Sequence, residues 1–68
     1  MIKVNLDRVM RQRGVGLVEL AEKVGITNAN MSLLKTGKVK GIRFETLGRI
    51  CEILGCQPGD ILEYSQDR

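Results

Sequence analysis

Residues 17–36 read L-V-E-L-A-E-K-V-G-I-T-N-A-N-M-S-L-L-K-T, from Leu17 to Thr36, and this stretch decides the fold of the chain. Its first half spaces apolar residues at i, i+3, i+4 and i+7, the pattern of one helix face: Leu17, Leu20, Ala21 and Val24. Gly25 follows at once, and glycine ends helices readily because it adopts positive φ without steric cost. The stretch therefore predicts two short helices, 17–24 and 28–36, joined by a turn at Gly25.

The second helix of this pair has its own start signal and its own buried side. Thr27 stands just before it, where a hydroxyl can cap a free backbone N–H. Met31 and Leu34, spaced by three, are expected to face inward. Ala21 leaves room where the two helices cross, and a bulkier residue there would cost about 1–3 kcal/mol through overpacking. Such a unit presents its second helix as a ridge that fits the DNA major groove, which predicts a DNA-binding module.

Seven positions of the stretch carry a resemblance to a known family. Counted from Leu17, the fifth position is small, the ninth is Gly, and the fourth, eighth, tenth, fifteenth and eighteenth are apolar: Ala21, Gly25, Leu20, Val24, Ile26, Met31 and Leu34. This pattern resembles the lambda-repressor-like, Cro-type helix-turn-helix family of small phage and bacterial regulators. The resemblance continues through G-K-V-K-G-I-R-F at 37–44 and the helix beyond, so it covers most of the chain.

The remaining segments predict three more helices, which gives an all-α fold of five compact helices. Asn5 is a suitable N-cap for a first helix that Gly14 ends. A fourth helix, ended by Gly55, has its apolar side marked by Phe44, Leu47, Ile50, Cys51 and Leu54. Gln57-Pro58 opens a last short helix, after which Ile61 and Leu62 return to the core. We expect residues 1–68 to form one DNA-binding domain, with the helix-turn-helix unit at 17–36.

The two ends of the chain leave an alternative open. Met1–Val4 and Ile61–Tyr64 both contain β-favourable residues and can pair as a two-stranded ribbon that ties the termini together. A ribbon of this size is marginal alone and needs the helices beneath it.

Length and cysteine usage exclude several classes of protein. Sixty-eight residues hold one core, and no run of about 18 apolar residues predicts a membrane span. The apolar run at the start is too short for a signal peptide, so a cytoplasmic protein is expected. Cys51 and Cys56 lack the spacing and the His partners of a zinc site, and we expect reduced thiols, a disulfide being the alternative. No metal, cofactor, small-molecule ligand or membrane contact is predicted.

The charge is mildly basic overall, with 11 Lys and Arg against 8 Asp and Glu, but it is unevenly placed. Four cations fall within nine residues that contain no acid: Lys35, Lys38, Lys40 and Arg43. Beside a recognition helix such a segment is where phosphates lie, the plain alternative being a solvated loop. The resemblance implies phosphate contacts from Lys38, Lys40 and Arg43, and the Thr27 hydroxyl and the helix 28–36 N-terminus would add to them.

Two positions depart from the family pattern. Relatives often open helix 17–24 with a polar pair, where this chain has Gly16 and Leu17, so only backbone amides are expected to contact phosphate there. Some relatives also pair a basic residue of the first helix with an acid late in the third. Met10 and Lys35 occupy those positions, which predicts that Lys35 is free to face phosphate.

Base contacts are expected from the N-terminal part of helix 28–36, through Asn28, Ala29, Ser32 and Leu33. The Asn28 amide can donate and accept at once, which matches the N6 and N7 edge of adenine; its alternative role is support of the helix cap. Leu33 is apolar on the outward side. It can meet a thymine methyl or a protein partner, and a single exposed Leu is also ordinary.

The predicted function is a sequence-specific transcriptional regulator, a repressor first of all, that inserts helix 28–36 into double-stranded DNA. Family members commonly bind palindromic sites as homodimers, with an interface that would involve Lys40, Gly41, Ile42, Cys56 and Gln57 here. The alternative is a protein-interaction module of the same fold, such as an antitoxin or anti-repressor subunit. With no His, no metal cluster and no Gly-rich phosphate loop, the sequence does not predict an enzyme.

Overall fold

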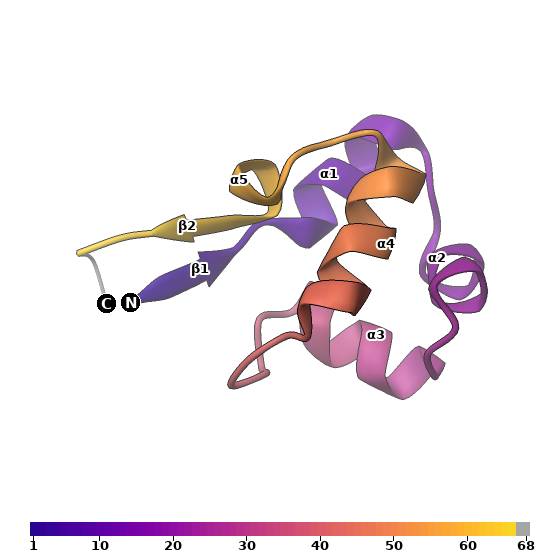
Figure 1. The fold of residues 1–68 in the computed structure, drawn as a ribbon, viewed down its shortest axis with the longest axis horizontal. Coiled ribbons are helices and arrows are strands. Elements are labelled where there is room, and N and C mark those ends of the chain that lie inside the picture. The colour runs from indigo at the N-terminus through magenta and orange to yellow at the C-terminus, as the bar shows by residue number, and fades with distance from the viewer. Residues whose placement is uncertain (67–68) are drawn as a thin grey trace.

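A computed structural model describes residues 1–66; residues 67 and 68, the end of the expected domain, lie outside this part. Along the chain it contains β1 (Ile2–Val4), α1 (Leu6–Arg13), α2 (Leu17–Val24), α3 (Asn28–Lys35), α4 (Phe44–Leu54), α5 (Pro58–Ile61) and β2 (Leu62–Tyr64). The helices surround one core and the ribbon projects from it along the 33 Å long axis (Figure 1). The five expected helices are confirmed, although α3 ends one residue early and Thr36 is its C-cap.

Each helix contributes one large, fully buried side chain to the core. These are Leu6, Leu20, Met31, Ile50 and Ile61, one from each of α1 to α5. Ala21 is also buried, and α2 packs directly on α3, as expected for a small residue in a helix crossing. Truncating a buried Leu or Ile costs about 2–5 kcal/mol. The contacts among these five side chains therefore stabilise the packing of α3 against the other helices. None of the helices within residues 1–66 is long and apolar enough to span a membrane.

The turn between α2 and α3 is closed by the backbone and by a distant arginine. Gly25 has φ +89°, and its N–H donates to the carbonyl of Ala21 at 2.8 Å. The N–H of Ile26 donates to the same oxygen at 3.1 Å. Arg49 of α4 donates from Nη1 to the carbonyl of Val24 at 3.3 Å, which satisfies an end of α2 that the helix itself leaves open.

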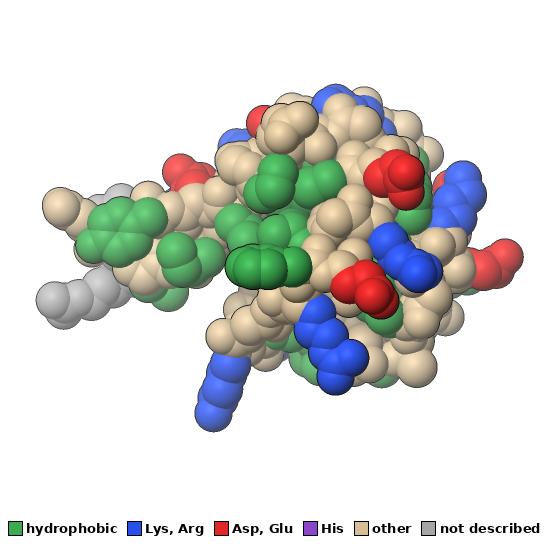
Figure 2. Space-filling model, viewed as in Figure 1, with side chains coloured by type: hydrophobic (Ala, Val, Ile, Leu, Met, Phe, Trp, Pro, Cys, Tyr) green, Lys and Arg blue, Asp and Glu red, His purple; other side chains and the backbone are tan. Residues whose placement is uncertain are grey.

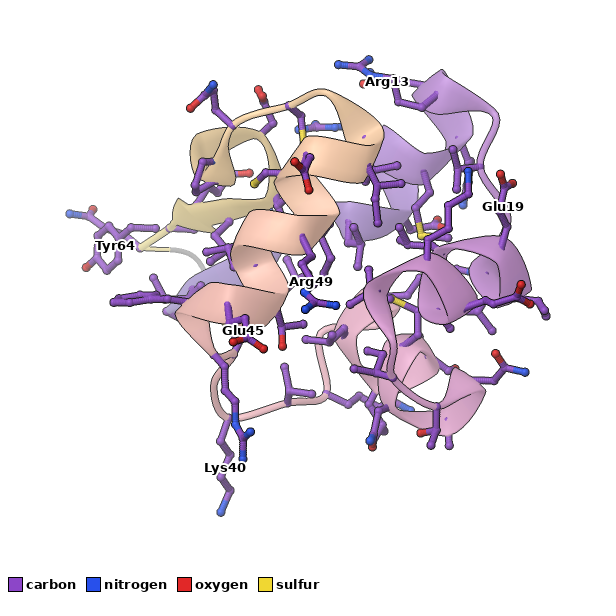
Figure 3. All side chains as sticks on the ribbon, turned by 45° about the vertical axis from the view of Figure 1, so that its right-hand side comes forward. Arg13, Glu19, Lys40, Glu45, Arg49 and Tyr64 are labelled. Carbon is purple, nitrogen blue, oxygen red and sulfur yellow. The ribbon has the colours of Figure 1, made fainter. Side chains whose placement is uncertain are left out.

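Arg13 does the same for the end of α4. Its Nε donates to the carbonyl of Leu54 at 2.8 Å, and an Nη donates to the carbonyl of Gly55 at 3.4 Å. Figure 3 shows Arg13 and Arg49 on the helices from which they reach these carbonyls. Neither role can be predicted from local sequence, since the partners of Arg13 and Arg49 lie 41 and 25 residues away along the chain.

The ribbon at the termini is present, so this open alternative is settled. β1 and β2 run antiparallel with Ile2 opposite Tyr64, Lys3 opposite Glu63 and Val4 opposite Leu62. The terminal amine of Met1 donates to the carbonyl of Ser65 at 2.6 Å, and the N–H of Asn5 donates to Ile61 at 2.6 Å. The ribbon is thus tied at both ends.

Two predicted roles near helix starts are wrong. Asn5 precedes α1 but makes no side-chain cap; its amide donates to Oε1 of Glu63 at 2.7 Å, because the ribbon brings that carboxylate within reach. Phe44 is not a core residue: 90% of it is exposed. It lies roughly 90° around α4 from the side buried by Leu47 and Ile50, and as the first residue it extends past the core.

The two cysteines are free thiols, as expected. Cys56 is buried and Cys51 is half-buried against the core. Burial, followed by the nearby Cys51 thiol, raises the pKa of the Cys56 thiol. Both residues therefore serve as small apolar groups at the end of α4.

Candidate nucleic-acid interface

The N-terminus of α3 is capped and open to solvent. Oγ of Thr27 accepts a hydrogen bond from the N–H of Asn30 at 3.1 Å, which confirms the predicted cap. The hydroxyl proton remains available as a donor. The first turn of α3 contains no acid, so the positive end of the helix dipole is not neutralised locally. This end can therefore accept an anion such as a phosphate.

The outward side of α3 carries the predicted base-contacting residues. Met31 and Leu34 are buried, whereas all four candidates are exposed: Asn28, Ala29, Ser32 and Leu33. Leu33, at 43% exposure, is the largest apolar side chain among them. Thr36 at the end of this side donates its hydroxyl back to the carbonyl of Ser32 at 2.9 Å, so it is engaged with its own helix. The outward surface of α3 is consequently made of short, uncharged side chains.

The prediction that Lys35 is free is wrong. Its Nζ lies 3.7 Å from Oδ1 of Asp7 on α1, so these two helices are joined by an ion pair after all. The signs are reversed relative to the family pattern, because here the acid is on the first helix and the base on the third. Asp7 also pairs with Arg11 one turn further along α1. Lys35 therefore faces α1 and is not held beside the other cations.

The loop from α3 to α4 holds three cations in fixed backbone positions. Gly37, at φ +73°, closes α3 with two bonds: its N–H donates to Leu34 at 3.1 Å, and the N–H of Lys38 donates to Leu33 at 2.9 Å. This pair of bonds is a Schellman motif, which sets the direction in which the chain leaves the helix. Val39 and Ile42 then pack against the core.

The cations alternate with these apolar anchors and point outward. Lys38, Lys40 and Arg43 are exposed, and no acid within residues 1–66 forms an ion pair with any of them. Lys40 reaches from the loop away from the body of the molecule (Figure 3). The structure therefore brings the three predicted phosphate ligands together on one loop beside α3, with their charges uncompensated.

Asn30 is a further candidate that sequence analysis left on the flank of the helix. It lines an open hollow of about 400 Å³ together with Arg43 of the loop and Ile26 of the turn. The hollow joins α3 to the cationic loop, so a phosphate there would meet an amide and a guanidinium at once. Helical phase could place Asn30 on a flank, but the fold of the loop was needed to show what lies opposite.

The start of α2 offers fewer groups for a phosphate contact than the start of α3. Gly16 is the N-cap of α2 and makes no side-chain cap, and Leu17 is half-buried, so only backbone N–H groups are available there, as the departure from the family pattern predicts. Within the described residues, no group of three or more His, Cys, Asp or Glu side chains is placed to hold a metal ion.

Comparisons with known proteins agree with this geometry. The "Uncharacterized HTH-type transcriptional regulator YozG" of Bacillus subtilis (strain 168) is 54% identical over 66 residues, which cover 97% of this chain and 79% of the relative. A crystal structure from Bacteroides fragilis superposes with a TM-score of 0.83 over 93% of this chain and 100% of that one, at 19% identity, which shows a shared fold. Residues 5–67 match a family described as the Cro/C1-type HTH DNA-binding domain. This chain therefore belongs to the family of Cro/C1-type HTH DNA-binding domains, which is not a family of enzymes.

Proposed function

We propose that this chain is a sequence-specific transcriptional regulator that acts in the cytoplasm as a repressor, with α3 inserted into the major groove of double-stranded DNA. The observation that carries the proposal is the combination of an exposed, uncharged side of α3 with three cations on the adjoining loop that form no ion pair within residues 1–66. The relative from Bacillus subtilis, named a transcriptional regulator, supports it. A compact domain seated on a promoter represses by excluding other proteins from the same DNA.

The residues divide into two groups by the kind of contact they make. Asn28, Ala29, Ser32 and Leu33 contact base edges, and a good bidentate contact such as that of Asn28 discriminates by about 1–3 kcal/mol. Thr27, Lys38, Lys40 and Arg43 contact phosphates and fix the register of α3 without reading sequence. Lys35 joins this second group only when DNA displaces its ion pair with Asp7.

We further propose a homodimer on a palindromic site. A two-fold protein places two copies of α3 in successive major grooves, about 34–36 Å apart. Inserting about 5 base pairs between half-sites turns one of them to the opposite face of the duplex, so binding of the dimer is expected to fall sharply. A spacer of about 10 base pairs restores the relative orientation of the two half-sites but not the distance between them, and serves as the control.

The experiment is a selection from randomised duplexes, followed by fluorescence-anisotropy titrations of the selected duplex against salt and unrelated competitor DNA. We expect binding that resists competitor DNA. The logarithm of the association constant should fall linearly with the logarithm of the salt concentration. Asn28→Ala is expected to weaken the free energy of binding to the selected duplex by about 1–3 kcal/mol and to relax the sequence preference. Arg8→Ala, an exposed cation on α1, is the matched control and should leave binding unchanged. Failure to enrich any sequence would refute the proposal.

A protein-interaction module of the same fold is the second candidate, because Leu33 exposes an apolar side chain on the outward side of α3. Leu33→Asp distinguishes the two functions. If this substitution abolishes a protein complex that forms without DNA, while the wild type shows no sequence preference, α3 binds protein. If it weakens only the selected duplex, α3 binds DNA.

A further inference from the structure

One face of the terminal ribbon is apolar, and its outer half is uncovered. Residues directly opposite in an antiparallel pair share a face, and so do alternate residues along each strand. Ile2, Val4, Leu62 and Tyr64 therefore form one side, called here the ribbon face, while Lys3 and Glu63 form the other. Ile2 and Tyr64 are 59% and 71% exposed. Figure 3 shows Tyr64 at the outer end of the ribbon, away from the helices.

The ribbon face borders a hollow of about 200 Å³. The lining comes from Ile2, Val4 and Leu62 of the ribbon and from Val39, Lys40 and Ile42 of the α3–α4 loop. Its floor is formed by core residues such as Leu34 and Ile50. An apolar cavity of about 150 Å³ is known to accept benzene, so this hollow has room for an aromatic ring.

Phe44 supplies a ring that projects into solvent. It is the first residue of α4, two residues after Ile42 of the hollow, and 90% of it is exposed. Figure 2 shows hydrophobic side chains gathered along the ribbon and over α4 on this face. Single exposed apolar residues are ordinary, but a contiguous group beside an apolar hollow marks an interaction surface.

We propose that this hollow receives Phe44 of a second copy of the chain, in a two-fold dimer that packs ribbon face, hollow and Phe44 against their equivalents. The inference rests on the homodimer proposed above and assigns its surface. A two-fold interface must be self-complementary, with each contact made twice. This surface meets that condition because one copy carries both the projecting ring and the hollow.

Charge complementarity favours the same partner. Lys40 lines the hollow, and Glu45 directly follows Phe44. Neither forms an ion pair within residues 1–66, and Figure 3 shows both pointing to solvent from the loop and from the start of α4. A ring that enters the hollow carries Glu45 of one copy toward Lys40 of the other, and the two-fold axis repeats the pair.

The area available suits a weak dimer. Covering the exposed parts of Ile2, Phe44 and Tyr64 removes roughly 300–500 Å² of surface per copy, taking about 150–250 Å² for each aromatic ring. The total of about 600–1,000 Å² lies in the range of weak, transient interfaces, so we expect a dissociation constant on the order of micromolar or weaker.

The base-contacting residues of α3 lie outside this surface and stay free for DNA. Lys38 and Arg43 do not line the hollow and also stay free for phosphate, whereas Lys40 exchanges its phosphate contact for Glu45 of the second copy.

The test is sedimentation equilibrium of the full chain without DNA, from about 1 µM to about 1 mM. The wild type is expected to pass from monomer to dimer. Phe44→Glu should raise the dissociation constant of the dimer by roughly 30-fold or more, because it places a charge in an apolar interface. Val18→Glu changes another exposed apolar residue, on α2, and should have no effect. Both sites are exposed, so both variants should keep the wild-type circular dichroism and melting temperature.

A charge exchange tests the pairing directly. Lys40→Glu should weaken the dimer several-fold, and adding Glu45→Lys should restore it. A dimer that survives Phe44→Glu overturns this interface and leaves the homodimer proposal standing. A wild type that stays monomeric while its hollow binds an apolar dye assigns the hollow to a small ligand and overturns the dimer. Binding to a duplex with a single half-site tests the DNA proposal separately, and Phe44→Ser, which removes the ring without adding a charge beside Arg43, should leave it unchanged.

Discussion

Replacing Gly25 with Ala tests whether the turn of the helix-turn-helix unit depends on a left-handed backbone. Gly25 has φ +89°, a conformation that costs an L-residue about 1–2 kcal/mol. A Cβ built there comes no closer than 3.8 Å, to Nη1 of Arg49, so steric contact adds little. Ala also restricts the unfolded chain, which offsets about 0.4–1 kcal/mol of the strain. From the middle of both ranges, the expected net loss in the free energy of unfolding is about 0.8 kcal/mol.

Gly48 supplies a control of opposite sign. It lies inside α4 with ordinary helical geometry, and nothing lies within 4 Å of an added Cβ. Gly48→Ala should therefore stabilise the protein by about 0.5–1 kcal/mol, because alanine is the better helix former. The measurement is urea unfolding followed by circular dichroism, with the m-value checked for constancy. For a domain of this size, 1 kcal/mol corresponds to roughly 4–8 °C in melting temperature, so the two variants should separate clearly.

The reasoning would be refuted by a Gly25→Ala protein as stable as the wild type, because the strain at positive φ is then absent. It would also be refuted if both variants changed stability in the same direction by similar amounts. In that case the effect of adding a methyl group would be generic and would not depend on the backbone conformation of Gly25.

Three further outcomes follow from the described contacts. Lys38→Ala with Arg43→Ala should reduce the slope of log affinity against log salt by about 2, measured by anisotropy, since each phosphate contact contributes about 0.9. Lys35→Met should change the free energy of unfolding by at most about 1 kcal/mol, because its ion pair with Asp7 is partly exposed; a larger loss in urea unfolding would contradict the screening argument. Burial raises the pKa of Cys56 above its ordinary 9.0, so the folded state holds this proton more tightly, and the free energy of unfolding should fall as pH rises above about 9; the fall should be smaller in Cys56→Ala.

The parts of the fold that sequence could predict are those determined by neighbours along the chain. Helix periodicity, the Thr27 cap and the glycines that end the helices depend on side chains within a few positions, and these predictions are confirmed. The buried side of α3 follows from the same local rule, since Met31 and Leu34 lie three residues apart. The terminal ribbon was left open because β-propensity at two ends says nothing about whether the ends meet.

The wrong predictions all concern contacts between segments distant in sequence. Lys35 was matched only with Met10, the position used in relatives, whereas Asp7 lies one turn earlier on the same face of α1 and reaches it. Asn5 was assigned a local cap, but the ribbon offered its amide a carboxylate 58 residues away. Phe44 fits the apolar spacing of α4, yet the core ends before it. A spacing rule gives the face of a helix but not the length over which that face is covered.

On the binding mode proposed here, the DNA-facing side of α3 is the part of the helix that the rest of the protein leaves exposed. Met31 and Leu34 are buried in the core, Lys35 forms an ion pair with α1, and the Thr36 hydroxyl donates to the carbonyl of Ser32. No cation is left on the outward side, so positively charged side chains for phosphate contacts have to come from the neighbouring loop, beside the helix N-terminus. That loop is held by the Schellman bonds of Gly37 and by its buried anchors, which orders its backbone before DNA arrives. Affinity and sequence preference are therefore carried by separate segments. The short side chains of α3 can change what is recognised without altering the core, the loop or the non-specific attraction to phosphate.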